Sequence, residues 1–427
     1  MSTATALDSW LGAASLPNAP LWTLEGLRRA DPVLGFALVM LVAVVVGEAL
    51  NRRLHLPRMC GHMLTGALAS PLALRLLERT DLDPLRPLVD LAVGVLVFEL
   101  GSRIRPRWLI DNPWLALTCV LEGVLAGVFC AGSMAALGAP PVSAALAGAV
   151  AMSTSPIVVL VLVHEVRSRG QVTERLLITT ALNSVLAVLA VKAWHVVVAA
   201  GAPSLGQDLP PAAANALFVV SGSLLLGAAM GALLTRLSQP MRGMTAVPVL
   251  QIALVILAAM LATRWRLSPL LVLLVAGMVA RAHMNHALTV EPHLGSAGAT
   301  LGVMLFVSTG MLFTVDHLRS LWPWVLALLL GRLAGKGLAV AALARPSGLS
   351  WRQAGALTLA LQPMSTLAVL LAADTPGFST PLPGLDPQVL QALLAATTLQ
   401  HLLGPVLTQW SLCTLAQESP ARAFGEP

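Results

Sequence analysis

Apolar runs long enough to cross a lipid bilayer recur along the whole chain. Breaking the sequence at charged, Pro-rich and Gly-rich positions gives about thirteen of them, most of roughly 17–25 residues, the length that a membrane-spanning helix needs. They lie at about 33–51, 59–77, 86–102, 113–137, 141–164, 174–200, 213–235, 244–263, 267–281, 295–314, 320–344, 351–373 and 387–415. The runs are continuous and do not alternate, so the sequence predicts an all-α polytopic membrane protein.

The composition agrees with this prediction and excludes other classes of protein. Of the 427 residues, 57% are hydrophobic and 11% are charged, and the mean hydropathy is +0.81. A soluble globular domain carries about 25% charged residues. A soluble enzyme, a nucleic-acid-binding protein and a disordered scaffold are therefore excluded, and the lipid bilayer is the first expected partner.

The chain is expected to form one membrane domain with short ends. We expect an extracytoplasmic segment at 1–31, a transmembrane domain at 32–416 and a short cytoplasmic tail at 417–427. Lys and Arg, among them Arg103 and Arg105, are more frequent in the predicted loops of one side, and such residues favour the cytoplasmic side of a membrane. This bias predicts that the N-terminus lies outside and the C-terminus in the cytoplasm.

Two of the runs contain a proline at corresponding places in the two halves of the chain, Ser155-Pro156 and Gln362-Pro363. A proline inside a helix removes a backbone donor and clashes with the preceding turn. In lipid, the freed backbone groups must find partners within the protein. We expect Ser155 and Gln362 to cap half-helices that restart with proline. Such a matched pair indicates an inverted-repeat transporter with a site near the membrane midplane. The alternative is a pair of proline-kinked packing helices.

Five short motifs around these breaks resemble those of a known family. They are Leu56-Pro57 with Gly61–Gly66, Val95–Gly101, Ser153–Pro156, Ala181–Ser184 and Gly331–Lys336. Their order and spacing over about 33–400 resemble the bacterial cation:proton antiporter superfamily, which includes the sodium/proton exchangers. The resemblance implies the sodium/proton antiporter fold, with about 13 transmembrane helices, an inverted repeat and two discontinuous crossing helices. It also implies exchange of Na⁺ or K⁺ for protons, a homodimer and a place in the bacterial inner membrane.

The resemblance is atypical at the position that binds the ion in the family. Family members carry an aspartate at the second position of the span-six pair, where this chain has Asn183-Ser184, and some carry an acid in place of Ser155. A hydroxyl can bind Na⁺ or K⁺ through its lone pairs but does not release a proton near neutral pH. The residues expected to bind the ion or substrate form a neutral polar patch: Thr154, Ser155, Asn183, Ser184, Gln362 and Ser365.

Two basic residues lie at predicted membrane depth, where a charge needs a partner or water. Arg332 and Lys336 are one helical turn apart and therefore share one face of the eleventh span. The resemblance directs that face towards the crossing of the two interrupted helices. There we expect these side chains to pair with an acid or to hold the half-helix ends.

Two acids are candidates for the proton carrier. Glu99 comes first, because it lies in an apolar stretch of the third-span motif, although Arg103 four residues later offers a structural ion pair. Glu122 comes second; it lies deep in the fourth span without a local partner and could face Lys192 or another basic residue.

The favoured function is a secondary transporter, not an enzyme, that exchanges a monovalent cation for protons. Two alternatives remain open: an anion transporter on the same fold, favoured by the basic pair and the helix N-termini, and a non-transporting or channel-like relative. His residues are scattered, and no catalytic or phosphate-binding motif rises above chance. We therefore expect no metal site, no cofactor and no nucleic-acid partner.

Overall fold

The computed structural model describes residues 32–70, 74, 86–104, 111–201, 209–239, 246–283, 295–311, 320–365 and 386–419. The predicted segment 1–31 lies outside these residues, as do most of the tail predicted at 417–427 and the last part of the twelfth predicted span, 366–373. The described residues are helical, apart from short turns and the two breaks discussed below.

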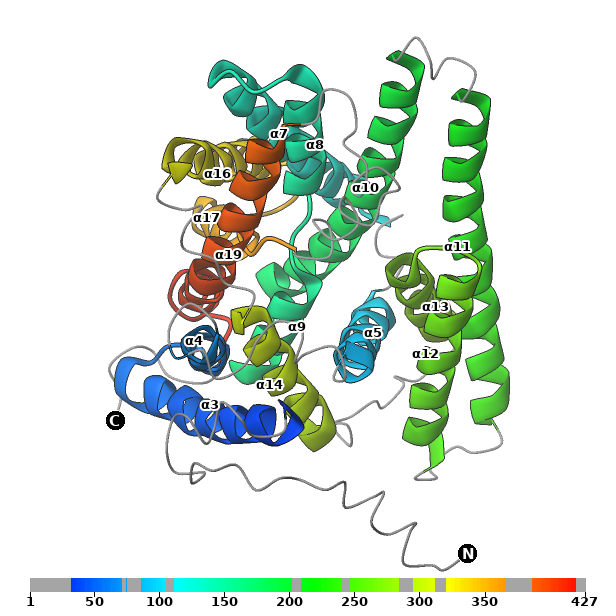
Figure 1. The fold of residues 1–427 in the computed structure, drawn as a ribbon, viewed down its shortest axis with the longest axis vertical. Coiled ribbons are helices and arrows are strands. Elements are labelled where there is room, and N and C mark those ends of the chain that lie inside the picture. The colour runs from blue at the N-terminus through cyan, green and yellow to red at the C-terminus, as the bar shows by residue number, and fades with distance from the viewer. Residues whose placement is uncertain are drawn as a thin grey trace, which may run out of the picture.

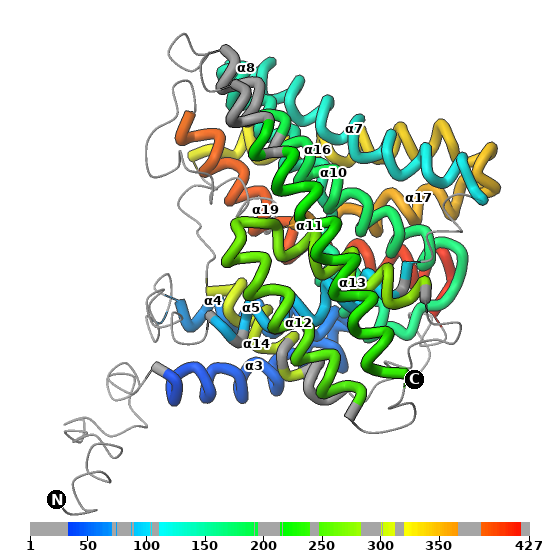
Figure 2. Tube along the Cα trace, turned by 90° about the vertical axis from the view of Figure 1, so that its right-hand side faces the viewer, coloured from blue at the N-terminus to red at the C-terminus, as the bar shows by residue number. Residues whose placement is uncertain are grey.

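One group of helices packs mainly within itself and is called here the outer bundle. It consists of α3 (Pro32–Leu54), α4 (Arg58–Ala69), α5 (Arg86–Arg103), α11 (Leu209–Ser238), α12 (Ala246–Arg264), α13 (Pro269–His283) and α14 (Gly295–Met311). Its largest contacts join α13 to α5 and α11, and α4 to α3 and α14. Helix α3 lies at the opposite end of the molecule from α7 and α16 (Figures 1 and 2).

The second group holds both interrupted helices and is called here the site bundle. It consists of α7 (Pro113–Ala136), α8 (Pro141–Ala151), α9 (Pro156–Glu165), α10 (Gln171–Gly201), α16 (Trp322–Ala344), α17 (Trp351–Ala360), α19 (Pro387–Trp410) and the π-helical turn η3 (Ser411–Leu415). Of an 18-residue window in the broken segment Pro141–Glu165, 94% is buried, against 22% for Val33–Leu54. The interrupted segment is therefore surrounded by protein, where irregular backbone is tolerated.

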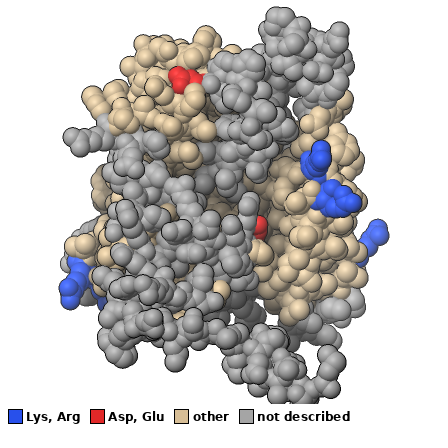
Figure 3. Space-filling model, in the orientation of Figure 1, with Lys and Arg blue, Asp and Glu red and all other residues tan. Residues whose placement is uncertain are grey.

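The predicted polytopic organisation is confirmed. Each predicted span has a helical counterpart, with α8 and α9 together forming the fifth, and eight helical segments within the described residues are long and apolar enough to cross a membrane. Several helices begin with proline in the first turn, where the missing N–H has no helical acceptor anyway. On the face shown in Figure 3, the charged side chains of the described residues are few, and the Lys and Arg side chains lie towards its left and right sides.

Glycines bring α7 and α16, the most extensively packed helix pair, into close contact. A Cβ atom on Gly335 of α16 would overlap the backbone of Leu125 and Ala126 on α7. On the other side of α7, a Cβ on Gly127 would lie 2.9 Å from Met152, at the end of α8. Because small residues let helix backbones approach within a membrane, these positions bring α16 and the first break against α7.

Gly335→Ala is expected to separate α7 from α16 and to lower stability by about 1–3 kcal/mol, as overpacking does in a tight interior. Gly132→Ala on α7 is the matched control, because a Cβ there meets nothing within 4 Å. Thermal unfolding in mild detergent measures both variants. An equal melting temperature for the two would contradict the close approach at Gly335.

Candidate functional site

The two helix breaks meet inside the site bundle. The backbone N–H of Ser155 donates to the carbonyl of Pro363 (2.8 Å), and the Thr154 hydroxyl donates to the carbonyl of Leu361 (3.2 Å). The Ser155 side chain caps α9 by accepting from the N–H of Val158 (3.5 Å), as the sequence predicted. Helices α8 and α17 thus end at one place, and the two breaks are joined by one backbone hydrogen bond and one hydrogen bond from a side-chain hydroxyl to a carbonyl.

The second break differs from the sequence-based expectation. The predicted capping of a restarted helix by Gln362 is wrong for the described residues, because Pro363, Met364 and Ser365 are not helical. The Gln362 amide instead donates back to the carbonyl of Thr358 (2.8 Å), within the last turn of α17. Gln362 therefore completes the end of the helix before the break, and its Oε1 atom is buried without a hydrogen bond in the described part of the chain.

Arg332 binds the carbonyl groups that both breaks leave free. Its Nη1 atom donates to the carbonyls of Ala151 and Ser153 (2.9 Å for the latter), and its Nη2 atom to those of Leu361 (3.4 Å) and Gln362 (3.1 Å). The C-terminal carbonyls of a helix carry a partial negative charge, which a cation stabilises. The carbonyl groups at the ends of α8 and α17 therefore stabilise the fully buried guanidinium of Arg332, which confirms the expected contact with the half-helix ends.

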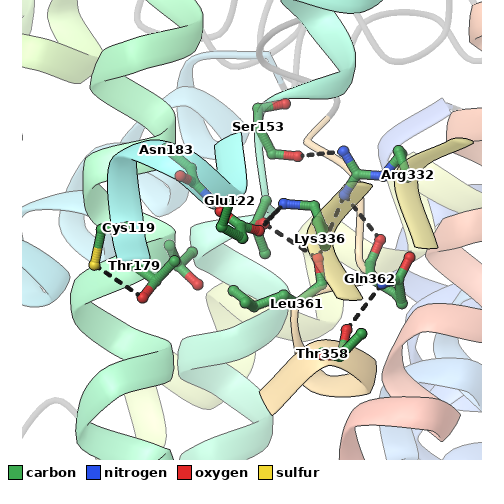
Figure 4. Close-up of polar contacts among 12 residues, drawn as sticks. Cys119, Glu122, Ser153, Thr179, Asn183, Arg332, Lys336, Thr358, Leu361 and Gln362 are labelled. Carbon is green, nitrogen blue, oxygen red and sulfur yellow. Dashed lines mark hydrogen bonds and ion pairs between the residues drawn. The ribbon is translucent and has the colours of Figure 1, made fainter. Parts of the chain in front are cut away.

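Lys336, one turn further along α16, forms an ion pair with Glu122 of α7 (Figure 4). Both side chains are 0% exposed. The Lys336 ammonium also donates to the Thr154 hydroxyl (3.2 Å), and the second Glu122 oxygen accepts from the amide of Asn183 (2.6 Å). The Glu122 carboxylate thus contacts side chains of both α16 and α10. Lys336 links it to Thr154, at the place where the two breaks meet.

This ion pair corrects the expectation of a neutral polar patch. Glu122 lies among the residues predicted to bind the ion, so the patch includes a carboxylate as well as two cations. The basic partner of Glu122 is Lys336, whereas the side chain of Lys192 lies outside the described residues. A buried pair of opposite charges needs further hydrogen bonds, and Thr154 and Asn183 provide them.

Two buried oxygen atoms near this pair accept no hydrogen bond from the residues that the structure describes. They are Oδ1 of Asn183 and Oγ1 of Thr180, one turn earlier on α10. The Asn183 oxygen faces α7, since a Cβ on Gly123 would lie 3.1 Å from it. Carbonyl and hydroxyl oxygens have the lone pairs that a monovalent cation needs. Thr180 was not among the predicted site residues; its position one turn before Asn183 is the signal that could have identified it.

The remaining predicted site residues lie further from the ion pair or bond elsewhere. The Ser184 hydroxyl donates to the carbonyl of Thr180 (3.0 Å) in its own helix. Ser365 is buried at the end of the described break. Glu99 lies on α5, where its carboxylate is 3.4 Å from Nε2 of His164 at the end of α9. Of the two candidate acids, Glu122 is therefore the one that is linked, through Lys336 and Thr154, to the place where the two breaks meet.

Comparisons with known proteins identify the family model and the fold that this chain matches. The family model described as "Sodium/hydrogen exchanger, transmembrane" matches residues 37–412. A solved structure of the sodium proton antiporter MjNhaP1 from Methanocaldococcus jannaschii at pH 8 is similar, with 15% sequence identity, a TM-score of 0.67, and coverage of 90% of this chain and 98% of that one. An electron-microscopy structure of MjNhaP1 gives 15% identity, a TM-score of 0.64, and coverage of 91% and 98%. A comparison with curated proteins finds no match.

Removing one member of the Glu122–Lys336 pair should be more harmful than removing both. Lys336→Met or Glu122→Gln alone leaves an unmatched buried charge and is expected to cost about 3–5 kcal/mol of stability. The double variant should recover most of that loss. Thermal and denaturant unfolding in detergent measure the difference.

Glu48→Gln is the control for this cycle, because Glu48 pairs with Arg52 (2.6 Å) on the exposed surface. Such pairs contribute about 0–1 kcal/mol. Strictly additive losses in the Glu122/Lys336 double variant would contradict a buried ion pair.

Proposed function

Because the chain belongs to the sodium/hydrogen exchanger family, whose members are membrane transporters and not enzymes, we propose that it exchanges Na⁺ for protons at the Glu122–Lys336 pair. The observation that carries the proposal is this buried pair, placed where two interrupted helices meet. Interrupted helices in a transporter supply ion sites near the membrane midplane. Sodium is preferred to potassium because sodium is the cation named for the family and for the similar structures.

The charge balance of the pair supports coupling of cation and proton. Glu122 is the carboxylate at the crossing, and Lys336 occupies one of its oxygens. A Na⁺ that binds Glu122 in the same interior adds a positive charge, which is costly unless another leaves. If the Lys336 ammonium releases its proton as Na⁺ binds, the total charge of the site does not change. One cation is then exchanged for one proton.

The proposed cation ligands are oxygens that already surround the pair. The Glu122 carboxylate supplies the charge, and Thr154 supplies a hydroxyl that now accepts from Lys336. Asn183 supplies its Oδ1 atom, which accepts no hydrogen bond from the described residues. Ser155, Ser184, Gln362 and Ser365 remain proposed lining residues of the same region. All four are buried. The side chains of Ser155, Ser184 and Gln362 form hydrogen bonds with backbone groups.

The position of Glu122 offers a reason for the atypical Ser184. In this chain the negative charge comes from α7 and reaches Asn183, the neighbour of Ser184 on α10. We propose that Glu122 replaces the aspartate that the family carries at the span-six position. Glu99, first in the sequence-based order, is the weaker candidate for the essential acid because its carboxylate lies 3.4 Å from Nε2 of His164 and not beside Lys336.

The anion-transport alternative loses its main support with this assignment. It required basic side chains without acidic partners, but Lys336 pairs with Glu122 and Arg332 donates to four backbone carbonyls. The non-transporting alternative is left to experiment. Further proposals follow the family resemblance: an inverted repeat, a homodimer, an N-terminus outside and a C-terminus in the cytoplasm of the bacterial inner membrane.

Sodium-driven proton flux in liposomes containing the purified protein tests the proposal. Wild type should acidify or alkalinise the lumen according to the direction of the Na⁺ gradient. Glu122→Gln keeps the shape of the side chain but removes its charge, so it should lower this flux by at least about 100-fold, the effect of losing an essential charged ligand. Glu99→Gln, the matched control, should keep most of the flux.

Two further gradients separate the alternatives. Flux driven by K⁺ but not by Na⁺ would change the proposed ion, and flux driven by an anion gradient alone would favour the anion transporter. Full sodium-driven flux in Glu122→Gln would reject Glu122 as the site.

A further inference from the structure

The end of the described chain folds back onto the start of α10. After η3, the backbone of Gln417 adopts a left-handed conformation (φ 58°), which is unusual for a residue other than glycine. The next residue, Glu418, donates its N–H to the carbonyl of Leu412 (3.1 Å). Such a backbone persists where the surrounding contacts hold it. Residues 416–419, here called the C-terminal turn, are held in this way.

The Glu418 carboxylate binds the free N–H groups at the start of α10. Its Oε1 atom accepts from the N–H of Val172, and its Oε2 atom from the N–H and the hydroxyl of Thr173, at 2.7, 2.7 and 2.8 Å. These are the second and third residues of α10, whose N–H groups a capping side chain normally binds. A carboxylate also suits the positive end of the helix dipole.

Gly170, immediately before α10, leaves room for this contact. It has no side chain that could cap the helix, and a Cβ atom there would overlap the Glu418 carboxyl group. The loop contributes further bonds to the C-terminal turn: the N–H of Arg169 donates to the Glu418 carbonyl (2.9 Å), and the Ser419 hydroxyl donates to the carbonyl of Val166. A cap that α10 lacks locally is therefore supplied from a position 246 residues away.

The contact joins the two helices that flank the proposed ion site. Helix α10 carries Asn183, which binds Glu122. Helix α19, which leads into the C-terminal turn, holds the second break: His401 lies 3.0 Å from the carbonyl of Met364, and the Thr408 hydroxyl donates to the carbonyl of Ala360 (3.1 Å). A continuous series of contacts therefore runs from the second break to α19, from α19 through Glu418 to α10, and from Asn183 of α10 to Glu122.

We propose that Glu418 is a positioning residue for transport: by tying α19 to α10, it holds Asn183 in place against Glu122 and the second break. This inference rests on the proposed function for its effect on transport. The tie itself is independent of that function. Glu418 touches neither the ion pair nor the breaks, so it acts only through the two helices.

The experiment compares Glu418→Ala with Glu174→Gln, which removes an exposed acid from the same first turn of α10. In Glu418→Ala, the amides of residues 172–173 should exchange with solvent at least about tenfold faster, because their acceptor is lost. The KM for Na⁺ in the liposome assay should rise about tenfold, with a smaller change in kcat, because the ligand set is less well ordered. Glu174→Gln should change neither quantity.

Gly170→Ala displaces the Glu418 carboxyl group from the other side and should reproduce both effects. The double variant Glu418→Ala, Gly170→Asp separates capping from the tie. It restores a local cap to α10, so exchange protection at 172–173 and the melting temperature should recover, while the KM for Na⁺ stays raised.

Recovery of the KM in the double variant would show that Glu418 only caps α10 and would overturn the positioning role. An unchanged KM in Glu418→Ala would overturn it as well. If wild type transports no Na⁺, the readout becomes amide exchange at residues 180–184. Faster exchange there in Glu418→Ala and in the double variant supports the tie even though the proposed function has failed, and unchanged exchange rejects the tie.

Discussion

Two positive charges in the interior of α16 determine how the site bundle is built. Arg332 and Lys336 are both fully buried, and a buried charge is tolerated only where it is matched. Arg332 is matched by carbonyls that α8 and α17 leave free where they end, and Lys336 by the carboxylate of Glu122. The dependence is mutual, because an uninterrupted α8 or α17 would use those carbonyls within its own hydrogen bonds. The breaks stabilise the charge, and the charge stabilises the breaks.

Close packing of α7 against α16 brings these charges together with Glu122. The glycine at 335 lets the backbones approach, so that Glu122 and Lys336 meet within the interior and away from water. On the opposite side Asn183 of α10 binds the second oxygen of Glu122. In the proposed exchange, a cation meets a carboxylate whose ion-pair partner is a lysine, a group that can lose a proton.

Local features of the sequence predicted much of this fold. Continuous apolar runs predicted the helices, the prolines at 156 and 363 predicted the breaks, and the family motifs predicted that the basic face of α16 would lie at the crossing. These features act over a few residues or one helical turn. The expected capping by Gln362 failed because the chain after Pro363 does not resume a helix within the described residues, so the side chain turned back to its own helix.

The partners of the charged groups could not be predicted in the same way. Glu122 and Lys336 are 214 positions apart, and their meeting depends on the rotation of two helices about their axes, which no local pattern gives. Glu99 and Glu122 are both acids in apolar runs, and the local features that ranked Glu99 first do not show that Glu99 packs beside His164 and Glu122 beside Lys336. The contact of Glu418 with α10 is of the same kind, since nothing in the local sequence around Glu418 indicates the helix that it caps.

The central claim is that a cation and a proton compete for the Glu122–Lys336 pair, and proton release on sodium binding tests it most directly. Purified protein in weakly buffered detergent solution is mixed with Na⁺, and the released protons are measured with a pH indicator. Wild type should release about one proton per bound Na⁺ and Glu122→Gln none, as expected for coupled groups that share one site. Sodium binding without proton release in wild type, or equal release from Glu122→Gln, would contradict the claim.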